Sequence, residues 1–181
     1  MDSGGKQLIM KVPIENFEFK QCTSEDLNRI LEIQDQAFMH LGSPNLLRKN
    51  TPEMFLECLQ APNVTLGAWY ENKLIAFSVL YFPNDDSESL VTELEGINID
   101  GLASANYKLC IVDRDFRGNS LQYELCMRLL QHASKGNIDI VCATASPDNM
   151  YSIANVEKLG FLYNRTLSKY GYERNLYYKF L

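Results

Sequence analysis

The order of apolar and polar segments in this 181-residue chain predicts an α/β fold with a mixed parallel and antiparallel sheet. A strand over 107–112, an amphipathic helix over 120–135 and a strand over 138–143 predict a parallel pair joined by a right-handed crossover. Further β-rich runs predict two antiparallel hairpins, at 64–70 with 74–82 and at 161–169 with 172–181.

The composition predicts one folded domain over 17–181, preceded by a flexible leader over 1–16. Hydrophobic residues make up 46% of the chain, with six prolines and ten glycines, which is enough apolar material for one sizeable core. The N-terminus lacks a basic segment followed by a long apolar run, and no stretch approaches the roughly 20 apolar residues of a membrane span. We therefore expect a soluble cytoplasmic protein without a membrane partner.

Cysteine usage and charge narrow the class further. The five cysteines are odd in number and form no C-x-x-C pair, which favours a reducing compartment. The net charge of −6 gives no global attraction to nucleic acid, so no nucleic-acid partner is expected. His40 and His132 stand apart from any acidic cluster, and we expect no metal site.

The N-terminal third reads as a strand and two helices. Residues 17–20 alternate apolar with charged side chains, which predicts a first strand. Thr23 is placed to cap a helix with Asp26 in the reciprocal position, and that helix is expected to end before Gly42. A second helix begins at Pro52, where the missing N–H costs nothing.

The stretch 83–104 is polar and acidic and reads as a long connection with little regular structure. Long connections inside compact domains are often functional. This one leads directly into the strand at 107–112, so its carboxylates are candidates for chemistry.

Two blocks in the second half resemble a known family. After Val112 the chain reads Arg117-Gly118-Asn119-Ser120-Leu121-Gln122, and further on it reads Ser146-Pro147-Asp148-Asn149 and then Glu157-Lys158-Leu159-Gly160-Phe161. The first block resembles the acyl-CoA pyrophosphate loop of the GNAT superfamily of N-acetyltransferases, Arg/Gln-x-x-Gly-x-Gly/Ala after a strand. The second resembles its Pro-x-Asn turn, short helix and Lys-x-Gly-Phe strand entry. Ser120 and Gln122 depart from the family pattern at its second glycine and last small position.

The resemblance implies a GNAT-like fold. Its sheet would be mixed and mostly antiparallel, with six or seven strands, a splayed parallel pair in the middle and helices on both faces. The splayed strands would end at 111–112 and 143–144, and the pantetheine arm of acetyl-CoA would lie in the gap.

The resemblance also implies acetyl-CoA as co-substrate, without a metal. Backbone N–H groups of the first block would bind the pyrophosphate, with the Arg117 side chain adding charge. The implied cofactor residues are Cys110, Ile111, Val112, Arg117, Gly118, Asn119, Ser120, Leu121, Gln122 and Asn149. Two plainer readings stay open: Gly-Asn-Ser is good helix-capping chemistry in itself, and Pro-Asp-Asn is a frequent turn.

The proton donor for the leaving thiolate is left open. Many family members have a tyrosine seven residues after this asparagine, where the chain has Val156. The phenol would come instead from Tyr151 or from Tyr170 in the closing hairpin, or water would protonate the thiolate.

The base is open as well. Glu93, Glu95, Asp100 and Asp113 flank the central strand, and Glu95 is preferred because apolar neighbours would partly bury it and raise its pKa. A covalent acetyl-cysteine at Cys110 or Cys142 is a further alternative.

These features predict an N-acetyltransferase that moves the acetyl group to a primary amine of a small molecule or peptide, by direct attack in a ternary complex. A non-catalytic acyl-CoA-binding or regulatory module on the same fold is the rival interpretation, favoured by Val156 and by the altered loop. In a third interpretation, the tyrosine-rich C-terminal hairpin forms a homodimer interface.

Overall fold

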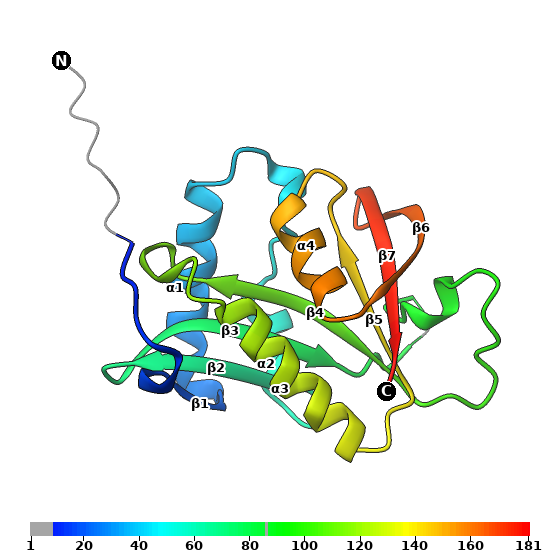
Figure 1. The fold of residues 1–181 in the computed structure, drawn as a ribbon, viewed down its shortest axis with the longest axis horizontal. Helices are drawn as coiled ribbons and strands as arrows, with labels where there is room; N and C mark the ends of the chain where they lie inside the picture. The colour runs from blue at the N-terminus through cyan, green and yellow to red at the C-terminus, as the bar shows by residue number, and fades with distance from the viewer. Residues whose placement is uncertain (1–8, 86) are drawn as a thin grey trace.

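A seven-stranded sheet forms the centre of the protein, whose computed structural model describes residues 9–85 and 87–181 (Figure 1). The strands lie in the order β1-β2-β3-β4-β5-β7-β6. Their bounds are β1 Glu18–Gln21, β2 Val64–Tyr70, β3 Lys73–Tyr81, β4 Ser104–Val112, β5 Ile140–Ala145, β6 Leu162–Lys169 and β7 Tyr172–Phe180.

Helices cover both faces of this sheet. In Figure 1, α3 and α4 lie on the near face, and α1 and α2 lie behind the sheet. Leu129 of α3 and Val156 of α4 share one buried cluster, whereas Ile33 of α1 and Phe55 of α2 share another. The helix bounds are α1 Leu27–Met39, α2 Pro52–Cys58, α3 Leu121–Lys135 and α4 Met150–Lys158.

The predicted α/β class is confirmed, including the central parallel pair. Strands β4 and β5 run parallel, and the other paired strands of the described chain are antiparallel. The crossover between β4 and β5 is α3, whose buried stripe contains Leu121, Leu125 and Leu129. That stripe has the spacing from which the helix was predicted.

A β-bulge lies where the parallel pair comes apart. Val79 pairs with Leu109 and Leu80 with Tyr107, so Lys108 is an extra residue on β4. Pairing between β4 and β5 ends at Tyr107 opposite Ala143, although both strands continue beyond that point. Because bulges bend a strand and increase its twist, Lys108 accounts for the divergence of the pair.

The helix signals near the N-terminus are confirmed. Thr23 and Asp26 form the expected reciprocal cap, although its first turn is a 3₁₀ turn over Ser24–Asp26. Thr51 caps α2, and Pro52 is its first residue. Among its described residues, the 83–104 connection contains one short 3₁₀ turn, Val91–Glu93, and β4 begins at Ser104 rather than at 107.

The predicted flexible leader is corrected in part. Residues 1–8 lie outside the described residues. Within 9–16, the N–H of Met10 donates to the carbonyl of Asp115 at 2.8 Å, and Ile14–Asn16 form a 3₁₀ turn. This part of the leader is held on the fold because its backbone bonds to the turn after β4.

Candidate functional site

A cleft opens where β4 and β5 diverge, and we call it the β4–β5 cleft. Its walls come from the α1–α2 loop, β4, the start of α3, the β5–α4 turn, α4 and the β6–β7 hairpin. The lining residues are Leu46, Leu47, Arg48, Asn50, Tyr107, Lys108, Leu109, Cys110, Gln122, Thr144, Ala145, Ser146, Asn149, Tyr151, Ser152, Val156, Tyr170 and Arg174.

The turn between β4 and α3 has the geometry of an anion site. Gly118 and Ser120 both adopt left-handed backbone conformations, with φ of 77° and 59°. Ser120 stands at the N-cap of α3, yet its side chain accepts no hydrogen bond from the helix. The first N–H groups of α3 therefore keep their donor capacity and partial positive charge for a ligand. This contradicts the plainer reading of Gly-Asn-Ser as a capping turn.

The Asn119 side chain faces away from α3, towards the N-terminal segment. Its Nδ2 donates to the carbonyl oxygens of Met10 and Phe116 at 2.7 and 2.9 Å, and its Oδ1 accepts from the N–H of Val12 at 3.1 Å. The Lys11 ammonium lies 2.8 Å from the carbonyl oxygen of Gly118. The N-terminal segment thus brings a lysine charge to the turn, where the sequence alone predicted only a leader.

The other predicted cofactor residues divide into three groups. The side chains of Cys110, Gln122 and Asn149 line the cleft. Arg117 is exposed on the turn. The remaining side chains pack in core clusters and leave only backbone groups for a ligand; they belong to Ile111, Val112 and Leu121.

Two asparagines fix the walls of the cleft. Asn155 of α4 donates to Oε1 of Gln122 at 3.1 Å and ties α4 to the start of α3. Asn149 caps α4 by accepting from the N–H of Ser152 at 3.0 Å, and its Nδ2 lies 3.5 Å from the carbonyl oxygen of Leu46. Asn149 is therefore both an ordinary helix cap and part of the cleft wall.

The two candidate tyrosines differ in burial. Tyr151 is 86% exposed at the cleft rim. Tyr170 is half-buried, and the Arg48 guanidinium lies 4.0 Å from the centre of its ring. Burial, and then the nearby Glu88 charge, raise the pKa of Tyr170, so its phenol is protonated at neutral pH. Val156 is 2% exposed in the core and offers no proton.

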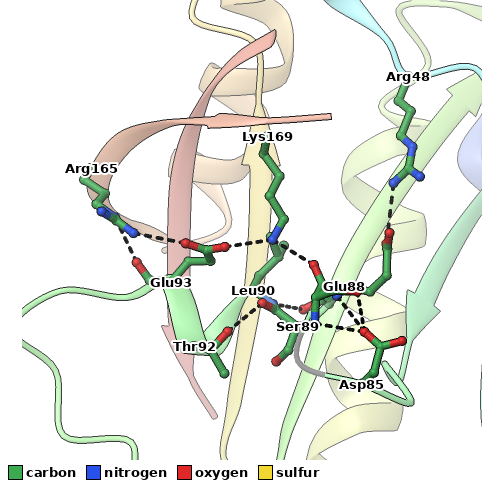
Figure 2. Close-up of polar contacts among 11 residues, drawn as sticks. Arg48, Asp85, Glu88, Ser89, Leu90, Thr92, Glu93, Arg165 and Lys169 are labelled. Carbon is green, nitrogen blue, oxygen red and sulfur yellow. Dashed lines mark hydrogen bonds and ion pairs between the residues drawn. The ribbon is translucent and has the colours of Figure 1, made fainter. Parts of the chain in front are cut away.

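The expected burial of Glu95 is wrong. Its side chain is 70% exposed, lies outside the cleft and forms an ion pair with Arg165. Figure 2 shows the neighbouring Glu93 held between Arg165 and Lys169 of β6. These pairs fasten the 83–104 connection to the edge of the sheet, which keeps the Glu95 carboxylate in solvent.

The other candidate bases also lie elsewhere. Asp113 is bound by Arg29 at 2.6 Å, and Asp100 is exposed in the connection. Within the described chain, no aspartate or glutamate lines the β4–β5 cleft. Three cationic side chains line it instead, those of Arg48, Lys108 and Arg174.

None of these three cations was predicted from the sequence. The position of Arg174 could have been predicted from strand periodicity, since it lies two residues before the buried Leu176 on β7 and so faces the same side of the sheet. Arg48 lies in a loop and Lys108 at a bulge, and periodicity gives no signal for either.

The acetyl-cysteine alternative finds no support. Burial raises the pKa of the Cys110 thiol to about 12 and that of Cys142 to about 12. Because the thiolate is the nucleophile, thiols that stay protonated at neutral pH are inert.

Neither a metal centre nor a membrane span is found over 9–85 and 87–181. No group of three or more His, Cys, Asp or Glu side chains there is arranged to hold an ion. None of the helices in those ranges has the length and apolar character that crossing a bilayer requires.

The acetyltransferase (GNAT) family model matches residues 27–161, from the start of α1 to the residue before β6. This chain belongs to the GNAT acetyltransferase family. GNAT acetyltransferases use acetyl-CoA, and the site fits that molecule: the uncapped start of α3 suits the pyrophosphate, and the cleft suits the pantetheine arm.

Solved structures agree with the GNAT fold. An N-acetyltransferase from Staphylococcus aureus Mu50 aligns with a TM-score of 0.69 and 18% identity over 91% of this chain and 98% of that one. The Escherichia coli ribosomal-protein-S18-alanine N-acetyltransferase gives 0.68 and 15% over 91% and 93%. The yncA protein of Salmonella typhimurium, solved with its cofactor acetyl-CoA, gives 0.68 and 16% over 92% and 94%. No curated protein sequence matches the chain.

Proposed function

We propose that this GNAT acetyltransferase is an acetyl-CoA-dependent N-acetyltransferase that acetylates a primary amine of a small molecule or peptide by direct attack in a ternary complex. One observation carries the proposal: the cleft at the divergence of β4 and β5 reaches Gln122 in the uncapped first turn of α3. When bound, acetyl-CoA supplies the thioester. The chain supplies binding, orientation and proton transfer.

The turn before α3 binds the pyrophosphate of acetyl-CoA. The backbone N–H groups of 118–122 bind the pyrophosphate, as the left-handed residues Gly118 and Ser120 bend this stretch into an anion-binding concavity. Arg117 and Lys11 add positive charge at its edge. Gln122 and Asn149 face the arm that enters the cleft.

Strand β4 polarises the thioester carbonyl. Beyond Tyr107, β4 no longer pairs with β5, so a backbone N–H of β4 near Ile111 is available as the donor. One such donor contributes about 3 kcal/mol to transition-state stabilisation in other enzymes.

Tyr170 donates the proton to the leaving sulfur. Its phenol lines the cleft and is protonated, and Arg48 over its ring fixes its orientation. Tyr151 is the weaker candidate because solvent surrounds its side chain.

The amine is deprotonated without a carboxylate neighbour. Arg48, Lys108 and Arg174 disfavour an ammonium beside them and so lower the pKa of a bound amine. Its proton passes to water in the cleft mouth, and the neutral amine attacks the carbonyl carbon.

The test is an amine panel with acetyl-CoA, read by CoA thiol release and by the mass of each product. Turnover of at least one amine, with one acetyl group added to its nitrogen and none to the protein, is expected. Tight acetyl-CoA binding without turnover of any amine would instead favour the non-catalytic module, for which the buried Val156 at the usual tyrosine position is the supporting observation.

A peptide acceptor, a homodimer and a cytoplasmic location complete the proposal. Fold neighbours named as ribosomal-protein-alanine N-acetyltransferases support the peptide class. Leu162 and Tyr163, 58% and 53% exposed on edge strand β6, support a pairing edge, which sedimentation would test. Five free thiols suit the reducing cytoplasm.

A further inference from the structure

The end of the cleft beneath the α1–α2 loop is built by contacts between distant segments. Arg174 of β7 donates from Nη1 to the carbonyl oxygen of Asn45 at 2.6 Å. Asn45 in turn donates to the Asp148 carboxylate at 2.8 Å, in the turn after β5. The loop therefore lies over the ends of β5 and β7 and closes one end of the cleft.

This end lies on the opposite face of the sheet from the turn over 118–122, to which we assign the pyrophosphate. Leu176, which faces the same side of β7 as Arg174, packs with Leu90 and Val91 of the 83–104 connection. Tyr177, on the other side of β7, packs with helices α3 and α4. Since that turn leads into α3, the guanidinium of Arg174 lines the part of the cleft on the other face of the sheet.

Arg174 is a buried cation without a carboxylate partner. It is 4% exposed, its second hydrogen bond runs from Nη1 to the carbonyl oxygen of Glu173 at 3.1 Å, and its guanidinium carbon lies 5.3 Å from the centre of the Tyr172 ring. Across the described residues, Nε and Nη2 have no hydrogen-bond acceptor and no acidic side chain pairs with the guanidinium. Burying a charge is costly unless a counter-ion compensates it, and an arginine fork matches a carboxylate in bidentate geometry.

The other two cations of the cleft are only half-buried, and each has a partner within the protein. Arg48 pairs with Glu88 at 3.5 Å, a contact visible in Figure 2. The Lys108 ammonium lies 3.9 Å from the centre of the Tyr81 ring. Asn50 adds a buried Oδ1 without a partner, an acceptor that suits an N–H of a bound molecule.

We propose that the acceptor of this enzyme carries a carboxylate, which Arg174 binds at the end of the cleft beneath the α1–α2 loop. The acceptor is then an amino acid or short peptide with a free carboxylate near its amine, rather than a polyamine. This inference rests on the proposed acetyl transfer only in calling the bound molecule an acceptor. The carboxylate site itself can be tested by binding alone.

The experiment measures binding of N-acetyl amino acids and of their carboxamides to the protein saturated with CoA, by calorimetry. These product-like probes require no turnover. We expect at least one N-acetyl amino acid to bind about tenfold more tightly than its carboxamide, the scale of one charge-assisted contact. Arg174→Gln is expected to abolish that difference, and Arg174→Lys to restore part of it.

The matched control is Arg128→Gln, since Arg128 lies on α3 outside the cleft and pairs weakly with Glu124 at 3.9 Å. It should keep the preference for the carboxylate. Equal affinities for acid and amide across the panel would overturn the inference. So would an Arg174→Gln protein that loses CoA affinity instead, because Arg174 would then serve the cofactor.

Kinetics separates the two proposals. If the protein turns over amines, wild type should show a lower KM for an amino acid than for its carboxamide. Arg174→Gln should raise the KM for the amino acid and leave that for the carboxamide unchanged. Amidation of the carboxylate also lowers the pKa of the amine and so favours its reactive neutral form. This effect alone would favour the carboxamide, so it cannot produce the expected preference for the amino acid. Binding of the N-acetyl acids without turnover of any amine would contradict the proposed acetyl transfer and leave the carboxylate site standing.

Discussion

Asn119 and Met10 are 109 positions apart in sequence, yet the Asn119 amide donates to the Met10 carbonyl at 2.7 Å. With its bonds to Val12 and Phe116, this side chain joins the N-terminal segment to the turn before α3. Asn119→Ala should lower the free energy of unfolding by about 1–3 kcal/mol, because three hydrogen bonds are lost. It should also weaken acetyl-CoA binding by loosening the turn.

Urea unfolding and calorimetry measure these two effects. Asn98→Ala is the control, because within the described part of the chain the Asn98 side chain forms only a local hydrogen bond, accepted from the N–H of Asp100. An unchanged urea midpoint for Asn119→Ala would show that the N-terminal segment is not held by this side chain.

Gly118 is the second position on which the turn depends. Its φ of 77° suits glycine, and an added Cβ would lie 2.9 Å from the Lys11 ammonium. Gly118→Ala should destabilise the fold by about 1–2 kcal/mol and weaken acetyl-CoA binding. Gly42→Ala is the matched control, with open space around the new Cβ. Equal thermal midpoints for the two variants would rule out the left-handed turn.

The sequence predicted the regular elements of this fold better than the residues that line the β4–β5 cleft. Periodicity gives the 121–135 helix and the flanking strands, because their burial is decided by neighbours three to four or two residues away. Motif spacing gave Gln122 and Asn149. It could not give Arg174 or Arg48, because the α1–α2 loop and the β6–β7 hairpin meet only in the folded chain. Glu95 was misplaced for the same reason, since its partner Arg165 lies on β6.

Tyr170→Phe should reduce kcat about 100-fold with little change in KM, because general acid catalysis commonly contributes 10²–10⁴-fold. The steady-state rate of CoA release measures the effect. Tyr163→Phe serves as control, since its hydroxyl bonds to Thr166 on the edge strand, away from the cleft. Loss of kcat in Tyr151→Phe but not in Tyr170→Phe would assign the donor role to the exposed tyrosine.

Alkaline pH should destabilise the fold through its buried thiols. Burial raises the pKa of Cys58 from 9.0 to about 11 and that of Cys142 from 9.0 to about 12. Above pH 9 the unfolded chain loses these protons while the native chain keeps them, so the native state binds more protons and stability falls as pH rises. Below pH 9 the stabilisation is complete.

Each of these two thiols should therefore contribute a loss of about 1.4 kcal/mol per pH unit between pH 9 and its native pKa. Urea midpoints at pH 7.5 and 10.5 measure the fall, and Cys142→Ala should make it smaller by the contribution of that one thiol. A midpoint that stays constant over this range would contradict the burial of the thiols.

The most direct test of the account is a calorimetric titration of the protein with acetyl-CoA, alongside Ser120→Gly and Ser120→Asp. We expect micromolar binding to wild type, equal or tighter binding to Ser120→Gly, which relieves a left-handed serine, and at least about tenfold weaker binding to Ser120→Asp. The Asp carboxylate would repel the pyrophosphate at the start of α3. No detectable binding to wild type, or equal affinities for all three proteins, would contradict the cofactor site and with it the proposed acetyl transfer.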